Sequence, residues 1–331
     1  MATREFMTCA LILSLVSCTT NEHHELNIIF NKETHTASID KSEYAGDIVI
    51  PSETKHNLST YYIAHIADEA FMNCDSLTSI TLPEGLLTIG ERAFFGCTRL
   101  AQLSIPQSVT QIAVNAFRET KYFKDSNNWT DNALYIGPWL IKIETLDSTF
   151  TIPKEVTHIA DGAFSGFLNH NPLKSIEVSV DNTHFTSTEG VLYDKSKSIL
   201  IAYPRLKNDT LARIAPNVTE IAPAAFLGCT NIKHVSFNEA ISHIENGTFR
   251  GCKSLLDISL PASITYIGDK AFSWCNELKQ IAVQSTTPPT LGDNVFEGVG
   301  MHIALYVPRE SIEKYREAKG WKDFKNILPI E

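Results

Sequence analysis

The sequence lacks an apolar run long enough to cross a membrane. A transmembrane helix needs about 20 consecutive apolar residues, whereas the N-terminal apolar stretch, residues 6–16, spans 11. An excess of positive charge is also missing, because 38 aspartates and glutamates outnumber 28 lysines and arginines and the formal net charge is −10. A negative surface repels the phosphate backbone of nucleic acids and anionic lipid head groups. We therefore expect no membrane span and no nucleic-acid partner.

The sequence also lacks the motifs of common catalytic sites. It contains no Gly-x-Ser-x-Gly, His-Glu-x-x-His, Gly-x-Gly-x-x-Gly or Gly-Lys-Ser/Thr, which position a nucleophile, a zinc ion or a phosphate group. Residues 23–25 read His-His-Glu, but two adjacent histidines without a fixed third ligand make a weak metal site. We expect a protein that is not an enzyme, with no cofactor and no bound metal.

Residues 1–17 are typical of a signal peptide, because their apolar stretch is too short to span a bilayer. The sequence Leu15-Val16-Ser17-Cys18 resembles the bacterial lipobox, in which the cysteine is acylated and becomes the mature N-terminus. We therefore predict an exported protein that is lipid-anchored through Cys18 in the bacterial envelope, at the outer membrane or cell surface. Residues 18–25 form a polar tether, and the lipid makes the only membrane contact. The alternative is an ordinary secretory peptide with a chance cysteine.

A unit of 23 residues repeats along the chain. Residues 70–83 and 93–106 both follow the pattern Ala-Phe-x-x-Cys-x-x-Leu-x-x-(Ile/Leu)-x-(Leu/Ile)-Pro. Phe164 stands alone between two runs of phenylalanines spaced by 23, and Phe296 follows the second run at 24. The two runs are Phe71, Phe94 and Phe117, and then Phe226, Phe249 and Phe272. This period, with leucine and isoleucine at fixed positions, is typical of leucine-rich repeats.

Each unit predicts a short strand and a turn. Ile80 and Leu82 alternate with polar residues, so both point to one side of a strand that Pro83 ends. The Ala-Phe segment is expected to form a short helical or 3₁₀ turn on the opposite, convex wall. We predict an α/β repeat fold, a leucine-rich-repeat solenoid with short strands on its concave face. Its stacked units share one continuous core.

Two stretches and both ends depart from the repeat. Residues 132–141 and 190–201 each read as a β-hairpin inserted between repeats. The chain ends differ from the repeat because solenoid ends must cover the core. The expected organisation after the tether is an N-terminal β cap 26–60, repeats 61–117, a hairpin insertion 118–150, a repeat 151–180, a second hairpin insertion 181–214, repeats 215–300 and a strand–helix cap 301–331.

Together these units resemble the BspA-like leucine-rich-repeat family of bacterial surface proteins. The resemblance covers nearly all of the chain after the tether, including the hairpin Gly190-Val-Leu-Tyr193 and the tail 305–308 with Trp321. It implies a cell-surface or secreted protein, and some members act as adhesins for host matrix proteins, for other bacteria or for themselves. A shared fold does not determine which of those partners a given protein binds.

Five cysteines recur at one position of the repeat, Cys74 and Cys97 in one array and Cys229, Cys252 and Cys275 in another. Adjacent rungs lie about 4.8 Å apart, so disulfides are geometrically open, and an exported protein is in an oxidising place. The array of three cannot pair fully, however, and there is no Cys-x-x-Cys pair that would indicate zinc. We predict buried free thiols, with disulfides as the alternative.

Polar residues alternate with the buried positions of the strands and are expected to face outward on the concave wall. This small, polar column is suited to receive a strand or helix of a partner protein through many weak hydrogen bonds. The alternative is a solvated sheet surface without a partner. The candidate binding residues are Ser79, Thr81, Gln102, Ser104, Ser175, Glu177, His234, Ser236, Asp257, Ser259 and Gln280.

The hairpin insertions carry aromatic side chains that would anchor a partner if they were exposed. The alternation of apolar and polar residues favours the alternative, in which they pack the hairpins onto the solenoid. The candidates are Tyr122, Trp129, Trp139 and Tyr193.

These patterns predict a non-catalytic cell-surface binding protein, an adhesin that recognises a host or bacterial surface protein through the solenoid face. Two alternatives stay open. A glycan-binding lipoprotein that presents polysaccharide to uptake machinery would expose Trp129 and Trp139 as a platform. A self-associating envelope protein would form oligomers that depend on concentration.

Overall fold

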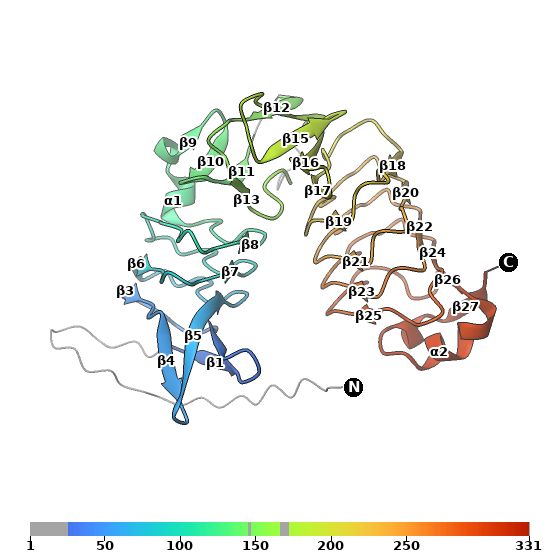
Figure 1. Cartoon of the computed structure of the whole chain (residues 1–331), viewed down its shortest axis with the longest axis horizontal. Helices are drawn as coiled ribbons and strands as arrows, with labels where there is room; N and C mark the ends of the chain where they lie inside the picture. Colours follow the sequence, from blue (N-terminus) through green and yellow to red (C-terminus); the bar gives the residue numbers. More distant parts are fainter. Residues whose placement is uncertain (1–25, 145–146, 166–171, 331) are drawn as a thin grey trace. The chain divides into compact units, whose positions relative to one another are not determined.

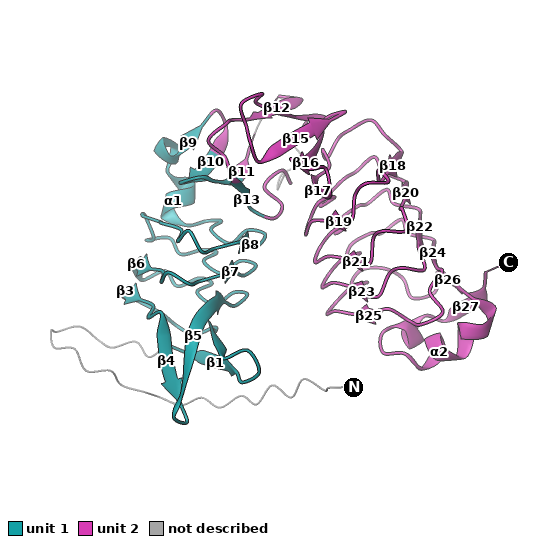
Figure 2. Cartoon of the chain, in the orientation of Figure 1, with its two compact units in different colours: residues 1–130, 134–141, 158–160 teal, residues 131–133, 142–157, 161–331 magenta. Residues whose placement is uncertain are grey.

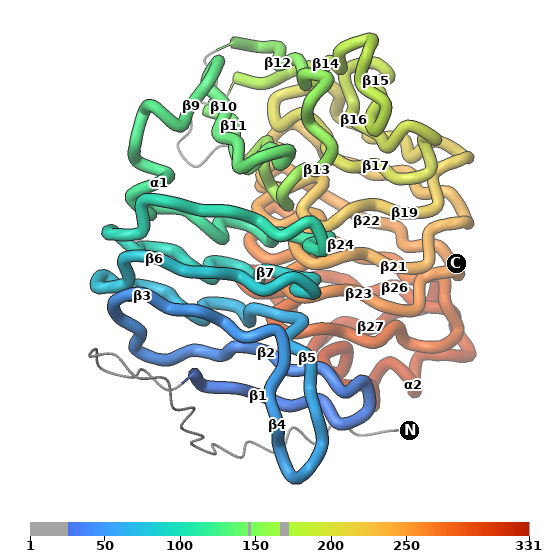
Figure 3. Tube along the Cα trace, turned by 60° about the vertical axis from the view of Figure 1, so that its left-hand side comes forward, coloured from blue at the N-terminus to red at the C-terminus, as the bar shows by residue number. Residues whose placement is uncertain are grey.

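The computed structural model describes residues 26–144, 147–165 and 172–330. The chain divides into two compact units (Figure 2). Unit 1 contains the chain up to residue 130 together with 134–141 and 158–160, and unit 2 contains 131–133, 142–157 and the chain from 161 onward. Each unit is a stack of extended rungs, which Figure 3 shows along the chain trace. The predicted signal peptide, the tether and Cys18 lie outside the described residues.

Unit 1 carries a short-strand sheet and a long-strand sheet, which we name after the strands of its repeats, two residues long at Thr88–Ile89 and five at Leu77–Thr81. Longer antiparallel strands extend the short-strand sheet at its N-terminal end. In the first sheet, β1 lies antiparallel to β2, β4 lies antiparallel to β5, and the remaining pairs are parallel. Its strands are β1 (Ile28–Asn31), β2 (Thr36–Ile39), β4 (Glu53–His56), β5 (Ser59–Ile66), β7 (Thr88–Ile89) and β8 (Gln111–Ile112). The long strands β3 (Gly46–Val49) and β6 (Leu77–Thr81) form a separate parallel pair. A further sheet has the order β13 (His158–Ile159), β11 (Trp139–Ile143), β10 (Ala133–Ile136) and β9 (Trp129–Thr130).

Unit 2 repeats the same two kinds of sheet on opposite sides of its stack (Figure 1). The long-strand sheets are β12 (Thr149–Ile152) with β14 (Ser175–Val178), β18 (Leu211–Arg213) with β20 (His234–Ser236), and β22 (Asp257–Leu260), β24 (Gln280–Val283), β26 (Ala304–Val307) and β27 (Asn326–Pro329). The short-strand sheets are β15 (Phe185–Thr188), β16 (Val191–Asp194), β17 (Ile199–Ala202) and β19 (Glu220–Ile221), and then β21 (His243–Ile244), β23 (Tyr266–Ile267) and β25 (Thr290–Leu291). Parallel pairing in register stacks each repeat position on the same position of the next rung.

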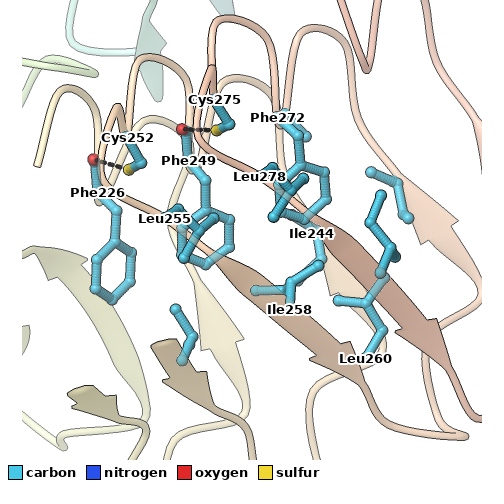
Figure 4. Close-up of a cluster of buried hydrophobic side chains, with 14 of the residues drawn as sticks. Phe226, Ile244, Phe249, Cys252, Leu255, Ile258, Leu260, Phe272, Cys275 and Leu278 are labelled. Atoms are coloured by element: carbon cyan, nitrogen blue, oxygen red, sulfur yellow. Dashed lines mark hydrogen bonds between the residues drawn. The ribbon is translucent and has the colours of Figure 1, made fainter. Parts of the chain in front are cut away.

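Stacked phenylalanines form the centre of each core. In unit 2 the ring of Phe249 lies 5.0 Å from that of Phe226 and 5.4 Å from that of Phe272, centroid to centroid, and all three side chains are 0% exposed (Figure 4). Phe71 and Phe94 stack at 4.9 Å in unit 1. The leucine and isoleucine positions of the repeat surround these rings, so a rung buries its apolar face only against its neighbours.

The Ala-Phe segments are turns and not helices. In the first repeat i→i+3 hydrogen bonds form at every second residue from Ala70 to Cys74, such as Met72 N–H to Glu69 O at 3.0 Å. The turns do not continue into a helix, because Glu69 and Asn73 adopt left-handed conformations with φ of 58° and 61°. The N–H of Phe71 then donates to the Ala93 carbonyl of the next rung at 2.7 Å. Glycine stands where Asn73 does in other repeats, as at Gly251 with φ of 71°, because it adopts this conformation without strain.

Helices are few and short among the described residues. The α-helices are α1 (Lys121–Lys124) and α2 (Ile312–Glu317), and the 3₁₀ helices are η1 (Ser126–Asn128), η2 (Arg309–Ser311) and η3 (Trp321–Asp323). Within the described ranges, no helix has the length and hydropathy to cross a bilayer. Helix α2 and η3 cover the last rung, where the indole N–H of Trp321 donates to the Pro289 carbonyl at 2.8 Å. The predicted leucine-rich-repeat solenoid with capped ends is confirmed.

The repeat cysteines are buried free thiols, as predicted, and the alternative of disulfides is wrong. Each thiol except that of Cys74 donates to the carbonyl of the aromatic residue in the preceding rung. The Sγ of Cys252 donates to the Phe226 carbonyl and that of Cys275 to the Phe249 carbonyl, both at 3.1 Å (Figure 4). Burial raises the pKa of Cys275 to about 12. These thiols are therefore polar fillers of the core and stay protonated at neutral pH.

The second hairpin insertion is part of the stack. Strand β16 pairs antiparallel with β17, and β17 pairs in parallel with β19, so the hairpin supplies a rung. At the end of β17, Ala202-Tyr203 takes the place of Ala-Phe. The Tyr203 ring stacks on Phe226 at 4.9 Å, and its N–H donates to the Ala225 carbonyl at 2.8 Å. The spacing from Tyr203 to Phe226 is 23 residues, a signal that sequence reasoning missed because it searched for phenylalanine.

Candidate binding surface

The strand period places the predicted polar column on the outward face of the long-strand sheets. On β22, Ile258 and Leu260 are buried at 1% and 0% exposure, whereas Asp257 and Ser259 point outward. The parallel register sets Asp257 beside Gln280 and Ser259 beside Ala282 of β24. In-register pairing therefore turns an alternating sequence into two outward columns.

Five of the candidate residues come together in unit 2. They lie on three long strands, and the imidazole Nδ1 of His234 is 2.8 Å from Oδ2 of Asp257, which links β20 to β22 across the gap between two sheets. All five side chains are exposed or half-buried. They are His234, Ser236, Asp257, Ser259 and Gln280. We call this set the unit 2 polar face.

Ser175 and Glu177 form a smaller outward group on β14 of unit 2. The Ser175 hydroxyl donates to Oε1 of Glu177 at 2.7 Å. Strand β14 pairs with β12 in a two-stranded sheet. The structure therefore places these two residues in a different sheet from the unit 2 polar face.

The remaining candidates lie in unit 1. Ser79 and Thr81 are exposed on β6, and Ser79 and its neighbour Thr78 donate to Oδ1 of Asp47 at 2.6 and 2.7 Å. These hydrogen bonds, that from Ser79 first, lower the pKa of Asp47. Gln102 and Ser104 are exposed in a segment without regular secondary structure.

The outward columns extend beyond the predicted residues. Register continues them to Ala304 and Tyr306 on β26, and to Asn326 and Leu328 on β27. In unit 1, Val49 on β3 lies beside Thr81. Sequence reasoning missed these positions because it collected outward residues only from strands within the repeats. A sequence signal that could have found them is a strand that ends directly before a proline, as at Val307-Pro308.

The aromatic side chains of the first insertion pack against the solenoid. Trp139 is 3% exposed and stacks on His158 at 4.7 Å. Trp129 is half-buried, and its indole N–H donates to the Phe123 carbonyl at 2.7 Å. The glycan-binding alternative predicts that Trp129 and Trp139 form an exposed platform. That prediction is wrong, because Trp139 is buried. The reason is that the insertion must cover the neighbouring core with its own apolar side chains.

The other two aromatic candidates also pack within the fold. The Tyr122 hydroxyl donates to the Tyr135 carbonyl at 2.9 Å, and burial raises the pKa of Tyr122. Tyr193 is 8% exposed. Tyr122 and Tyr193 therefore pack the insertions onto the stack, which is the interpretation that the sequence favoured, and they are not exposed anchors. In the parts of the chain that the structure describes, no three His, Cys, Asp or Glu side chains are grouped for a metal ion.

A family model described as the BspA type leucine rich repeat region matches the chain in six copies, over residues 63–189 and 206–316. The chain belongs to the BspA type leucine-rich-repeat family. The gap between the matched ranges holds the hairpin strands β16 and β17. BspA-type proteins are bacterial surface proteins, and their solenoid is typically a binding scaffold without enzymatic activity.

Solved structures of several bacterial proteins are similar to this BspA-type chain at low identity. A leucine-rich repeat protein from Eubacterium ventriosum is 20% identical, with 92% of this chain and 82% of that chain covered and a TM-score of 0.44. The pneumococcal vaccine antigen PcpA is 15% identical, with coverages of 93% and 97% and a TM-score of 0.42. A leucine rich cell surface protein from Faecalibacterium prausnitzii is 21% identical, with 96% of each chain covered and a TM-score of 0.38. No curated protein matches the chain.

Proposed function

We propose that this BspA-type protein is a non-catalytic surface adhesin that binds a host or bacterial surface protein through the unit 2 polar face. The observation that carries the proposal is the placement of five polar side chains on adjacent long strands, all exposed or half-buried. The small serine side chains of this face let a partner approach the sheet closely and lose little conformational entropy on binding. The His234–Asp257 pair adds a charged point for orienting the partner.

We also propose that the protein is held at the cell surface by a lipid on Cys18. The lipobox-like residues 15–18 support this proposal. A single acyl chain holds a protein only marginally, so the several chains of a lipoprotein anchor are needed for stable attachment. We expect Cys18→Ser to release the protein into the medium, measured by fractionation, and an unchanged membrane fraction would contradict the anchor.

Binding of the chain from residue 19 onward to a panel of matrix proteins and bacterial surface proteins tests the adhesin. We expect saturable binding to one of them, which Ser236→Arg and Ser259→Arg reduce by about tenfold or more, because two bulky charges block close approach to the sheet. The matched control is Thr290→Arg, an exposed position on the short-strand side. Equal loss of binding in the control, or no binding to any protein of the panel, would contradict the proposal.

A further inference from the structure

The long-strand sheets have open strand edges at both ends of the chain. Strand β3 pairs only with β6, and β27 pairs only with β26, among the described residues. Both strands are accessible where they face outward, since Asp47 and Val49 on β3 and Asn326 and Leu328 on β27 are exposed. An open edge presents unpaired N–H and C=O groups that can accept another strand.

The same outward position is apolar on both terminal strands. Val49 is 70% exposed and Leu328 is 41% exposed. Val49 lies beside Thr81, and Leu328 lies beside Tyr306, the residue that occupies the position of Thr81 in the last repeat. The repeats between them carry mostly polar residues at this position: Thr81, Ser104, Thr151, Glu177, Arg213, Ser236 and Ser259. An exposed, branched aliphatic side chain at this position is thus a feature of the ends alone.

Charges of opposite sign accompany the two edges. Between residues 40 and 53, the segment that contains β3, four carboxylates outnumber one lysine. Between residues 314 and 325, the segment that leads into β27, five lysine and arginine side chains outnumber two carboxylates, and all five are exposed. Opposite charge favours the approach of one end to the other and disfavours the pairing of two like ends.

We propose that a second copy of this chain occupies these edges, with β27 of one copy pairing in parallel with β3 of the next. Parallel pairing continues the direction of every long-strand pair in both units. It brings Leu328 of one copy beside Val49 of the other, so that each covers apolar surface of its neighbour. This head-to-tail contact goes beyond ligand binding by the unit 2 polar face.

The contact is heterologous, because it joins two different surfaces. A heterologous contact leaves one free edge at each end of the pair and grows into rings or open chains. Each edge is only four residues long, and Pro329 and Pro51 limit the ladder. Such a short edge gives weak association, so the average mass rises with protein concentration. Salt weakens it because the end charges are solvent-exposed.

Sedimentation equilibrium of the chain from residue 19 onward, with and without two single variants, tests the proposal. We expect Val49→Lys and Leu328→Asp each to be monomeric at concentrations where the unchanged protein associates. The decisive sample is their equimolar mixture. The first variant keeps an intact β27 edge and the second keeps an intact β3 edge, so the mixture associates although neither variant associates alone.

The matched control is Val180→Lys, which changes a still more exposed apolar residue, 93% exposed, away from both edges. It is expected to associate like the unchanged protein, and circular dichroism checks that all three variants are folded. Unchanged protein that stays monomeric up to millimolar concentration would overturn the proposal. So would variants that still associate alone, because that result requires a contact elsewhere, or a mixture that stays monomeric.

Discussion

At the scale of single residues, the cysteine thiols in the core of the repeats have backbone partners. The cysteine thiol is small enough to fit under a turn, and it donates to a backbone carbonyl of the preceding rung. In unit 2 these carbonyls belong to Phe226 and Phe249. The cysteine position is therefore structural, although the residue type is one that also serves catalysis and metal binding.

We expect the five described thiols to be unreactive in the folded protein. Only the thiolate reacts with a disulfide reagent, and burial raises the pKa of both Cys97 and Cys275 to about 12. Titration with such a reagent at about pH 8, close to the pKa of a free thiol, should label no repeat cysteine in the native protein and all five after addition of denaturant. Rapid labelling without denaturant would contradict the buried ladder.

At the scale of elements, the end of β17 shows how the repeat accommodates a different residue. The Tyr203 ring keeps its place in the aromatic stack, and its hydroxyl donates to Oδ2 of Asp209 at 2.6 Å. This hydrogen bond is the main reason that the pKa of Asp209 is lowered, and Lys207 adds to the effect. A pair of this kind ties the hairpin rung to the loop that follows it.

Because the folded pKa of Asp209 is lowered, its ionised form stabilises the fold at pH values above about 4, the pKa of an unfolded aspartate. That contribution disappears as the pH falls through the lowered folded pKa. We expect Tyr203→Phe to cost about 0.5–1 kcal/mol in the free energy of unfolding at neutral pH, a modest value because solvent screens the half-exposed carboxylate. The free energies of unfolding of both proteins, measured in urea, should become equal as the pH is lowered to about 2, well below the pKa of an unfolded aspartate. A constant difference across this range would assign the effect to packing alone.

At the scale of the whole molecule, the described residues include two large clusters of buried side chains. One runs from Ala37 to Ala160 and the other from Val191 to Ile327. In a repeat protein each rung is stabilised mainly by its neighbours, so stability is a sum of local terms. Two clusters of this kind need not unfold together.

We therefore expect Phe249→Ala to destabilise unit 2 by about 3–5 kcal/mol, through loss of buried area and an unfilled cavity. Thermal unfolding followed by calorimetry should show the transition of unit 2 at a lower temperature and that of unit 1 unchanged. Val180→Ala is the control, since that side chain is 93% exposed and its truncation should shift neither transition. A single transition that shifts as a whole would show that the chain unfolds as one unit.

The sequence by itself determined the repeat, the alternation of buried and outward residues and the buried state of the cysteines. A period of 23 residues and a strand period of two are local properties, and stacking repeats them without new information. This is why Asp257 and Ser259 were placed on the outward face from the sequence alone. The alternative prediction of an exposed platform of Trp129 and Trp139 was wrong. The sequence could not show this, because the burial of the insertion depends on which neighbouring core it covers.

Only the tertiary structure decided which side chains meet across strands and which edges stay open. The pair of His234 with Asp257 comes from the register between adjacent rungs. The matching positions of Val49 and Leu328 come from the strand register at each end, where the sequence pattern has already faded. The physical reason is that end rungs bury one face instead of two, so their residues are selected by the cap and by solvent and no longer by the repeat.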